Sequence, residues 1–203
     1  MTQLFNVNIH RKVLYMKLRQ ISENASGIPA KKVRQSHDYD CGAAALRSVA
    51  ASFGVGPDTE EEFIEICKTC KETGTPPNEL VRAAKNIGLK AKIISHMGMQ
   101  NLMHFLDRGK PVICAIQAWG KEDEYDKLDD GHYIVAIAYD DKNIYFEDPS
   151  MDGDRGRLSH DEFLERWKDR DYRGDIKTKM GIVFSRGGYG LEKKNVGDSK
   201  KIP

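Results

Sequence analysis

The sequence lacks the features that mark several protein classes. Only 4 of its 203 residues are cysteine, too few for a disulfide framework in a chain of this length. No apolar run approaches the roughly 18 residues needed to span a membrane, and polar residues interrupt the N-terminal segment where a signal peptide would have its apolar core. There is also no low-complexity segment and no internal repeat. We therefore expect one cytoplasmic domain with free thiols.

Charge is segregated along the chain, although the net charge is only +1. Residues 1–34 carry a net charge of +6 and residues 185–203 one of +3, whereas residues 35–184 carry −8. The acidic body would repel phosphates, so we expect no nucleic-acid partner. The chain divides into a basic N-terminal arm or extra strands (1–27), a folded domain (28–185) and a flexible basic tail (186–203).

Hydrophobic periodicity predicts helices mainly in the first half of the body and strands mainly in the second. Capping boxes begin at Thr59 and Ser159. Helices before strands predict an α+β fold, in which a helical half packs on an antiparallel sheet and leaves a cleft between them. The predicted helices are 41–53, 59–71, 78–87, 99–108 and 159–167, and the predicted strands are 89–94, 112–119, 132–139, 144–148 and 181–185. Residues 4–16 would form one or two strands or an extended arm.

Cys41 is the candidate nucleophile. It lies in the first turn of a predicted helix, where free N–H groups and the helix dipole stabilise a thiolate. Gly42 would leave room for a substrate carbonyl, and Gln35 supplies an N–H donor six residues upstream, as an oxyanion hole requires. The alternative is a free cysteine packed in the core.

His132 is the best placed of the six histidines to act as the base, because it opens a strong predicted strand. Asp148 ends the following strand. A two-residue turn between these strands would pair Asp148 with Val135, on the face opposite to His132. A three-residue loop would pair Asp148 with Ile134 instead, and would bring it within reach of His132 on the same face. Both registers stay open.

Two segments together resemble a known family. Residues 35–46 read QSHDYDCGAAAL, and residues 131–135 read GHYIV, followed by Asp148-Pro149. They resemble the two motifs of the bacteriocin-processing, double-glycine-leader cysteine peptidases of the papain-like superfamily. Further stretches resemble the stand-alone branch of this family, and the resemblance covers about residues 28–185.

The resemblance implies a papain-like fold and a cysteine peptidase without metal or cofactor. Cys41 would be the nucleophile, His132 the base, Asp148 the residue that orients it and Gln35 the oxyanion donor. Peptides or proteins would be the substrates, with cleavage of leader peptides after double glycine as one form of the reaction. The alternatives are a thiol acyl-transferase or peptide ligase of the same fold, and a peptide-binding module without turnover.

Other features surround this candidate site. Gly131 precedes His132, and Trp119 ends a predicted strand where it would either form the wall of a subsite or pack in the core. The loop 120–130 holds six acids and two lysines; it is either solvated or a negative rim that favours basic substrates. Cys67 and Cys70 form a lone CxxC on the apolar stripe of a predicted helix, which favours core packing over a metal or redox site.

Overall fold

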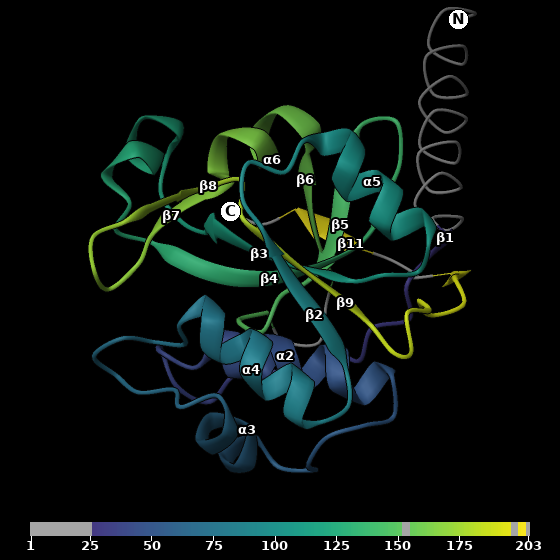
Figure 1. Cartoon of the computed structure of the whole chain (residues 1–203). Coiled ribbons are helices and arrows are strands. Elements are labelled where there is room, and N and C mark those ends of the chain that lie inside the picture. Colours follow the sequence, from purple (N-terminus) through teal and green to yellow (C-terminus); the bar gives the residue numbers. More distant parts are fainter. Residues whose placement is uncertain (1–25, 152–154, 196–198, 202–203) are drawn as a thin grey trace, which may run out of the picture.

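A seven-stranded sheet forms the centre of the molecule (Figure 1). The computed structural model describes residues 26–151, 155–195 and 199–201; the strands or extended arm predicted over 4–16 lie outside these residues. Neighbouring strands pair antiparallel, except β11 and β6, which pair parallel. In sheet order the strands are β11 (Ser199–Lys201), β6 (Arg155–Ser159), β5 (Asn143–Glu147), β4 (Gly131–Tyr139), β3 (Val112–Gln117), β9 (Gly181–Ser185) and β2 (Lys90–Ile94).

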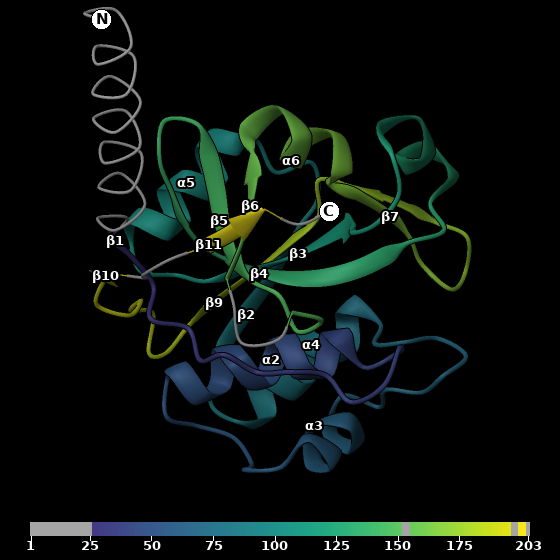
Figure 2. The same ribbon diagram turned by 180° about the vertical axis from the view of Figure 1, so that it is seen from behind.

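Helices cover both faces of this sheet, as Figures 1 and 2 show from opposite sides. One face carries α2 (Cys41–Ser52) and α4 (Pro77–Asn86), with α3 (Glu60–Ile66) packed outside α2. The other face carries α5 (Met99–Asp107) and α6 (His160–Arg166). The arrangement confirms the predicted α+β fold class. Within the described part of the chain, no helix has the length and apolar character needed to cross a membrane.

Small side chains let α2 lie close to the sheet. Most of its residues are buried, and Ala43, Ala44 and Ala45 are fully so. The helix contacts β4 on one side and α3 and α4 on the others. Gly54 follows the helix with φ of +64°, a left-handed conformation that glycine adopts at little cost. This packing brings the N-terminus of α2 to the start of β4.

The β4–β5 hairpin combines the two registers that the sequence left open. Asp140 N–H donates to the Asn143 carbonyl at 3.0 Å, so the turn has two residues. A β-bulge between Ala136 and Ala138 then shifts the pairing by one residue. Val135 therefore pairs with Glu147. If the pairing continues by one residue, Asp148 lies opposite Ile134. The bulge thus places Asp148 on the face of His132.

Within the folded domain, one helix is shorter than predicted and several elements were not predicted. The helix predicted over 59–71 ends at Ile66, because Lys68 takes a left-handed φ of 50°. Strand β6 and the hairpin of β7 (Lys168–Arg170) and β8 (Ile176–Thr178) were not predicted.

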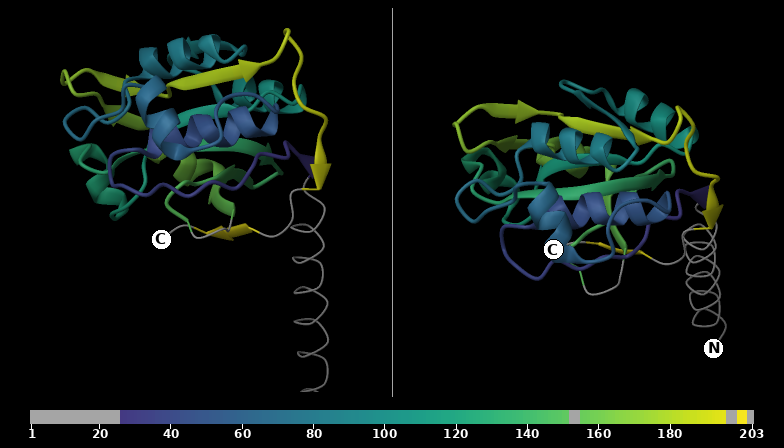
Figure 3. Two further views of the ribbon diagram at one scale, coloured as in Figure 1. Left: turned by 90° about the horizontal axis from the view of Figure 1, so that it is seen from below. Right: turned by 60° about the horizontal axis from the view of Figure 1, so that its bottom comes forward.

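Part of the segment predicted as a flexible tail is packed against the domain. Leu191 N–H donates to the Gly109 carbonyl at 2.7 Å, and β10 (Lys194–Asn195) pairs with β1 (Ser26–Gly27). Figure 3 shows this pairing at one edge of the molecule.

Candidate active site

The N-terminus of α2 and the start of β4 meet at a pocket of about 300 Å³. Cys41 is the first residue of α2, and His132 is the second residue of β4. Both side chains line the pocket. No side chain caps the N-terminus of α2, so its first N–H groups remain available to stabilise negative charge.

His132 is held between Asp148 and Cys41. Its Nε2 lies 2.7 Å from Asp148 Oδ1, and both side chains are buried. Burial lowers the pKa of His132, but hydrogen bonds with Asp148 and Cys41 outweigh it and raise the pKa to about 10. Because Nε2 is bonded to Asp148, Nδ1 is the nitrogen that can exchange a proton with the Cys41 thiol.

Asp148 is itself fixed by its neighbours. Its Oδ1 accepts hydrogen bonds from the Ser150 backbone N–H at 2.8 Å and the Ser150 hydroxyl at 2.7 Å. Burial raises the pKa of Asp148, but His132 and Ser150 together hold the pKa below its usual value. The carboxylate is therefore charged at neutral pH and oriented toward the imidazole.

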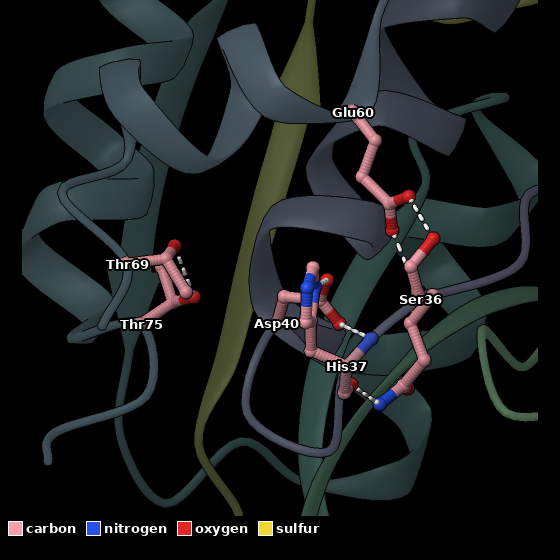
Figure 4. Close-up of polar contacts among 7 residues, drawn as sticks. Ser36, His37, Asp40, Glu60, Thr69 and Thr75 are labelled. Carbon is pink, nitrogen blue, oxygen red and sulfur yellow. Dashed lines mark hydrogen bonds and ion pairs between the residues drawn. The ribbon is translucent and has the colours of Figure 1, made fainter. Parts of the chain in front are cut away.

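Two buried carboxylates hold the loop that precedes Cys41 (Figure 4). Glu60 accepts hydrogen bonds from the Ser36 backbone N–H at 2.9 Å and from the Ser36 hydroxyl at 2.5 Å. Asp40 accepts from the His37 backbone N–H at 3.3 Å and bonds His37 Nδ1 at 2.9 Å. This bond raises the pKa of His37. The His37 imidazole is therefore bonded to Asp40 and helps to hold this loop in place.

Gln35 lies at the start of the same loop. Its backbone N–H donates to the Pro149 carbonyl at 2.9 Å, which ties the loop to the residue after Asp148. Its side-chain Nε2 donates to the His37 carbonyl at 2.7 Å. Gln35 does not line the pocket. The Gln35 backbone therefore lies close to the His132–Asp148 pair. One of the two hydrogens on the side-chain amide of Gln35 is bonded within the loop.

The three residues expected to contact substrate have different surroundings. Gly131 lines the pocket. Gly42 is buried, and a Cβ there would lie 2.6 Å from Thr75 Cβ; close packing against Thr75 therefore requires a glycine at this position. Trp119 is 43% exposed, and its ring centroid lies 5.1 Å from that of His132. The two rings are tilted by 51°, so Trp119 packs at an angle against the imidazole, and it does not line the pocket.

The pocket also has walls that the sequence did not single out. Tyr39 and Tyr133 flank Cys41 and His132, and the β7–β8 hairpin adds Asp169 and Tyr172. A second pocket of about 410 Å³ continues beneath the same hairpin and shares Pro76, Pro77, Asp171, Tyr172, Lys177 and Met180 with the first. A groove therefore leads away from Cys41. Nothing in the sequence indicated that the hairpin residues would line the pocket, because β7 and β8 lack an apolar stripe.

The other cysteines differ from Cys41. Burial raises the pKa of Cys67 to about 12 and raises the pKa of Cys114 as well. Cys70 Sγ lies 3.1 Å from the Thr73 hydroxyl. Across the residues that the structure describes, no group of three or more His, Cys, Asp or Glu side chains is placed to hold a metal ion.

Comparisons with known proteins agree with this geometry. Residues 30–170 match the peptidase C39 family. An uncharacterised protein of Methanothermobacter marburgensis is 34% identical over 131 residues, which are 64% of this chain and 78% of that protein.

Two solved structures are similar to this fold. The peptidase domain of Streptococcus ComA, a bifunctional ABC transporter of a quorum-sensing pathway, is 26% identical with a TM-score of 0.60, over 77% of this chain and 98% of that one. A double-glycine motif protease from an AMS/PCAT transporter, solved with its leader peptide, is 20% identical with a TM-score of 0.57, over 78% of this chain and 96% of that one. The second likeness concerns the fold alone.

Proposed function

This chain belongs to the peptidase C39 family, and from this membership we propose that it is a cysteine peptidase with Cys41 as its nucleophile. The observation that carries the proposal is the buried His132, which interacts with both Cys41 and Asp148. A thiol at a helix N-terminus, beside an imidazole that a carboxylate orients, is suited to nucleophilic attack on an acyl group. A cysteine that only packs in the core needs neither partner.

In the acylation step, the Cys41 thiolate attacks the carbonyl carbon of the scissile peptide bond. The tetrahedral intermediate collapses as the C–N bond breaks, and the His132 imidazolium gives its proton to the leaving amine. Asp148 keeps the imidazole in one orientation, in which Nδ1 faces the thiol and can give its proton to the leaving group. The products of this step are a free amine and a thioester on Cys41 Sγ.

In the deacylation step, water replaces the amine. His132, now neutral, takes a proton from the water as the oxygen attacks the thioester carbonyl. The C–S bond then breaks, which releases the carboxylic acid and restores the thiolate and the imidazolium.

Two donors would stabilise the oxyanion of both steps. One is the backbone N–H of Cys41, at the uncapped N-terminus of α2. The other is the second amide hydrogen of Gln35, since only one is bonded to the His37 carbonyl. The Glu60–Ser36 hydrogen bonds hold the loop from which Gln35 would act.

The substrate is a peptide or a protein segment in this account. The neighbour solved with its leader peptide supports this class of substrate, and the resemblance of the motifs extends it to leaders cleaved after double glycine. An amine could also attack the thioester carbonyl in place of water, so that the acyl group forms an amide as the C–S bond breaks and the Cys41 thiolate is restored; the protein would then be a ligase. A peptide-binding module would not need the thiol at all.

A peptide library tests the proposal. The full chain and its Cys41→Ala variant are incubated with mixed-sequence peptides, with and without an added amine acceptor, and the products are identified by mass spectrometry. We expect cleavage by the unmodified chain and none by Cys41→Ala. Products joined to the amine without hydrolysis would favour the ligase, and equal cleavage by both proteins would contradict a thiol mechanism.

A further inference from the structure

The mechanism uses none of the four carboxylates that line the pocket, Asp38, Asp129, Asp169 and Asp171. Asp38 and Asp129 are exposed, and Asp171 pairs with Lys177, which leaves Asp169. Asp169, on β7, lines the pocket together with Cys41 and His132. A Cβ on Gly131 would lie 2.3 Å from Asp169 Oδ1, so this carboxylate lies against the backbone of the residue before His132. A group that contacts Asp169 is therefore close to the reacting carbonyl.

Neutral hydrogen-bond donors hold this carboxylate in place. Its Oδ1 accepts from the Arg170 backbone N–H at 2.8 Å and from Gln117 Nε2 at 3.2 Å. In the described part of the chain, no lysine or arginine forms an ion pair with it: Lys168 pairs with Asp126, and Lys177 pairs with Asp171 at 3.1 Å.

Its burial also favours a positive partner. Burial raises the pKa of Asp169 to about 6. The carboxylate is therefore still mostly charged at neutral pH, but its charged form is less stable than that of a carboxylate in water. A cation that enters the pocket would lower this cost. An uncharged substrate side chain at the position that contacts Asp169 would leave the carboxylate unpaired.

We propose that Asp169 makes this pocket selective for a basic side chain, lysine or arginine, within about two residues of the scissile bond. The inference rests on the proposed peptidase function. A residue of extended peptide spans about 3.3–3.6 Å, so a carboxylate beside Gly131 can reach only the nearest substrate residues. Tyr39, Tyr133 and Tyr172 line the same pocket, and aromatic side chains can contact both the aliphatic stem and the charged end of such a residue.

The acidic loop 120–130 contributes less to this selectivity. Of its carboxylates, Glu124 pairs with Lys127 and Asp126 pairs with Lys168. Only Asp129 of this loop contributes a carboxylate to the pocket, and its side chain is exposed. Exposed charges are screened by salt and contribute little singly. The sequence-based hypothesis of a negative rim that favours basic substrates is therefore replaced by one that involves a single half-buried carboxylate, Asp169.

A focused peptide set tests Asp169. N-acetylated peptides carry lysine, norleucine, glycine or glutamate at each of the two positions on either side of the scissile bond, and kcat/KM is measured for each. Norleucine matches the stem of lysine but has no charge. We expect the unmodified chain to prefer lysine over norleucine at one position by about 10- to 150-fold, the value of a charged hydrogen bond.

Asp169→Asn should reduce this lysine-to-norleucine ratio to near one, because asparagine keeps the size and the Gln117 contact but not the charge. Asp123→Asn, on the exposed acidic loop outside the pocket, is the matched control and should keep the ratio. Copies of the peptides without the acetyl group test whether an N-terminal ammonium is bound instead of a side chain.

Several outcomes would overturn the inference. Cleavage without any preference for lysine would do so while leaving the peptidase function intact, and so would a preference that appears only in unacetylated peptides. An Asp169→Asn variant that slows every peptide equally would show that Asp169 acts on His132 and not on the substrate. If the unmodified chain cleaves no peptide, the proposed function fails and this inference fails with it.

Discussion

Replacing Asp148 by asparagine isolates the effect of one charge on His132. Asp148 Oδ1 lies 2.7 Å from His132 Nε2, and the side chains of His132 and Asp148 are only 2% and 3% exposed, so water and salt screen the pair little. Asparagine has almost the same shape and keeps an acceptor for the imidazole. The substitution therefore removes the charge and leaves the packing close to that of the unmodified protein.

The size of the effect follows from this geometry. A hydrogen bond to a charged group contributes about 1.5–3 kcal/mol. If that contribution stabilises the imidazolium in the transition state, its loss slows the reaction about 10- to 150-fold, because 1.36 kcal/mol corresponds to a factor of ten in rate. His132→Ala removes the proton donor itself and should abolish nearly all turnover.

The assay compares three variants on one peptide from the library. Asp148→Asn and His132→Ala are measured beside Asp141→Asn, which removes an exposed carboxylate at the β4–β5 turn. Values of kcat/KM give the catalytic effect, and thermal melts followed by circular dichroism show whether each variant folds. Two results would refute the reasoning: activity of Asp148→Asn within twofold of the unmodified chain, or losses equal to those of His132→Ala with both variants folded.

Three further predictions concern the thiols, the loop before Cys41 and the pocket. Iodoacetamide near neutral pH should alkylate Cys41 first, since Cys67 and Cys114 are buried with raised pKa values; mass spectrometry that finds Cys67 or Cys70 labelled equally fast would contradict this. Glu60→Gln should lower the free energy of unfolding by about 1–3 kcal/mol and reduce kcat, because one of the two Ser36 donors loses its acceptor; a melting temperature equal to that of the exposed control Glu61→Gln would oppose this. The preference for lysine should fade as the pH falls from 7 to 5, because burial and the nearby Asp171, against the opposing effect of His132, raise the pKa of Asp169 to about 6; a lysine-to-norleucine ratio that is constant over this range would count against a titrating carboxylate.

Local sequence signals predicted the elements that carry the candidate site. The helix that begins at Cys41 and the strands of the β4–β5 hairpin appear within one or two residues of their predicted bounds. Their apolar patterns are strong because these elements lie against the core. The capping box at Thr59 is also present, with both of its hydrogen bonds.

The contact between His132 and Asp148 could not be derived from turn length alone. The turn has two residues, which would place the two side chains on opposite faces. The bulge between Ala136 and Ala138 reverses this, and nothing in the local sequence marks a bulge among buried apolar residues. Register there is decided by the packing of the whole sheet.

The walls of the pocket were missed for a different reason. Strands β7 and β8, whose residues line the pocket, consist largely of charged and polar residues such as Asp169 and Lys177, so they show no hydrophobic alternation. Strand β6, which lies outside the pocket, was missed for the same reason. Their positions depend on tertiary contacts. Gly156, for example, has no room for a side chain, because a Cβ there would lie 2.1 Å from the Phe146 ring.

The most direct test of the central claim is to trap the acyl-enzyme. The full chain is mixed with an equimolar cleavable peptide, quenched in acid within a turnover and measured by intact mass spectrometry. The account predicts a mass increase equal to the acyl half of the peptide, located on Cys41, removed by hydroxylamine and absent from Cys41→Ala. An adduct on another residue, or cleavage by Cys41→Ala at the rate of the unmodified chain, would contradict a peptidase that works through the Cys41 thiol.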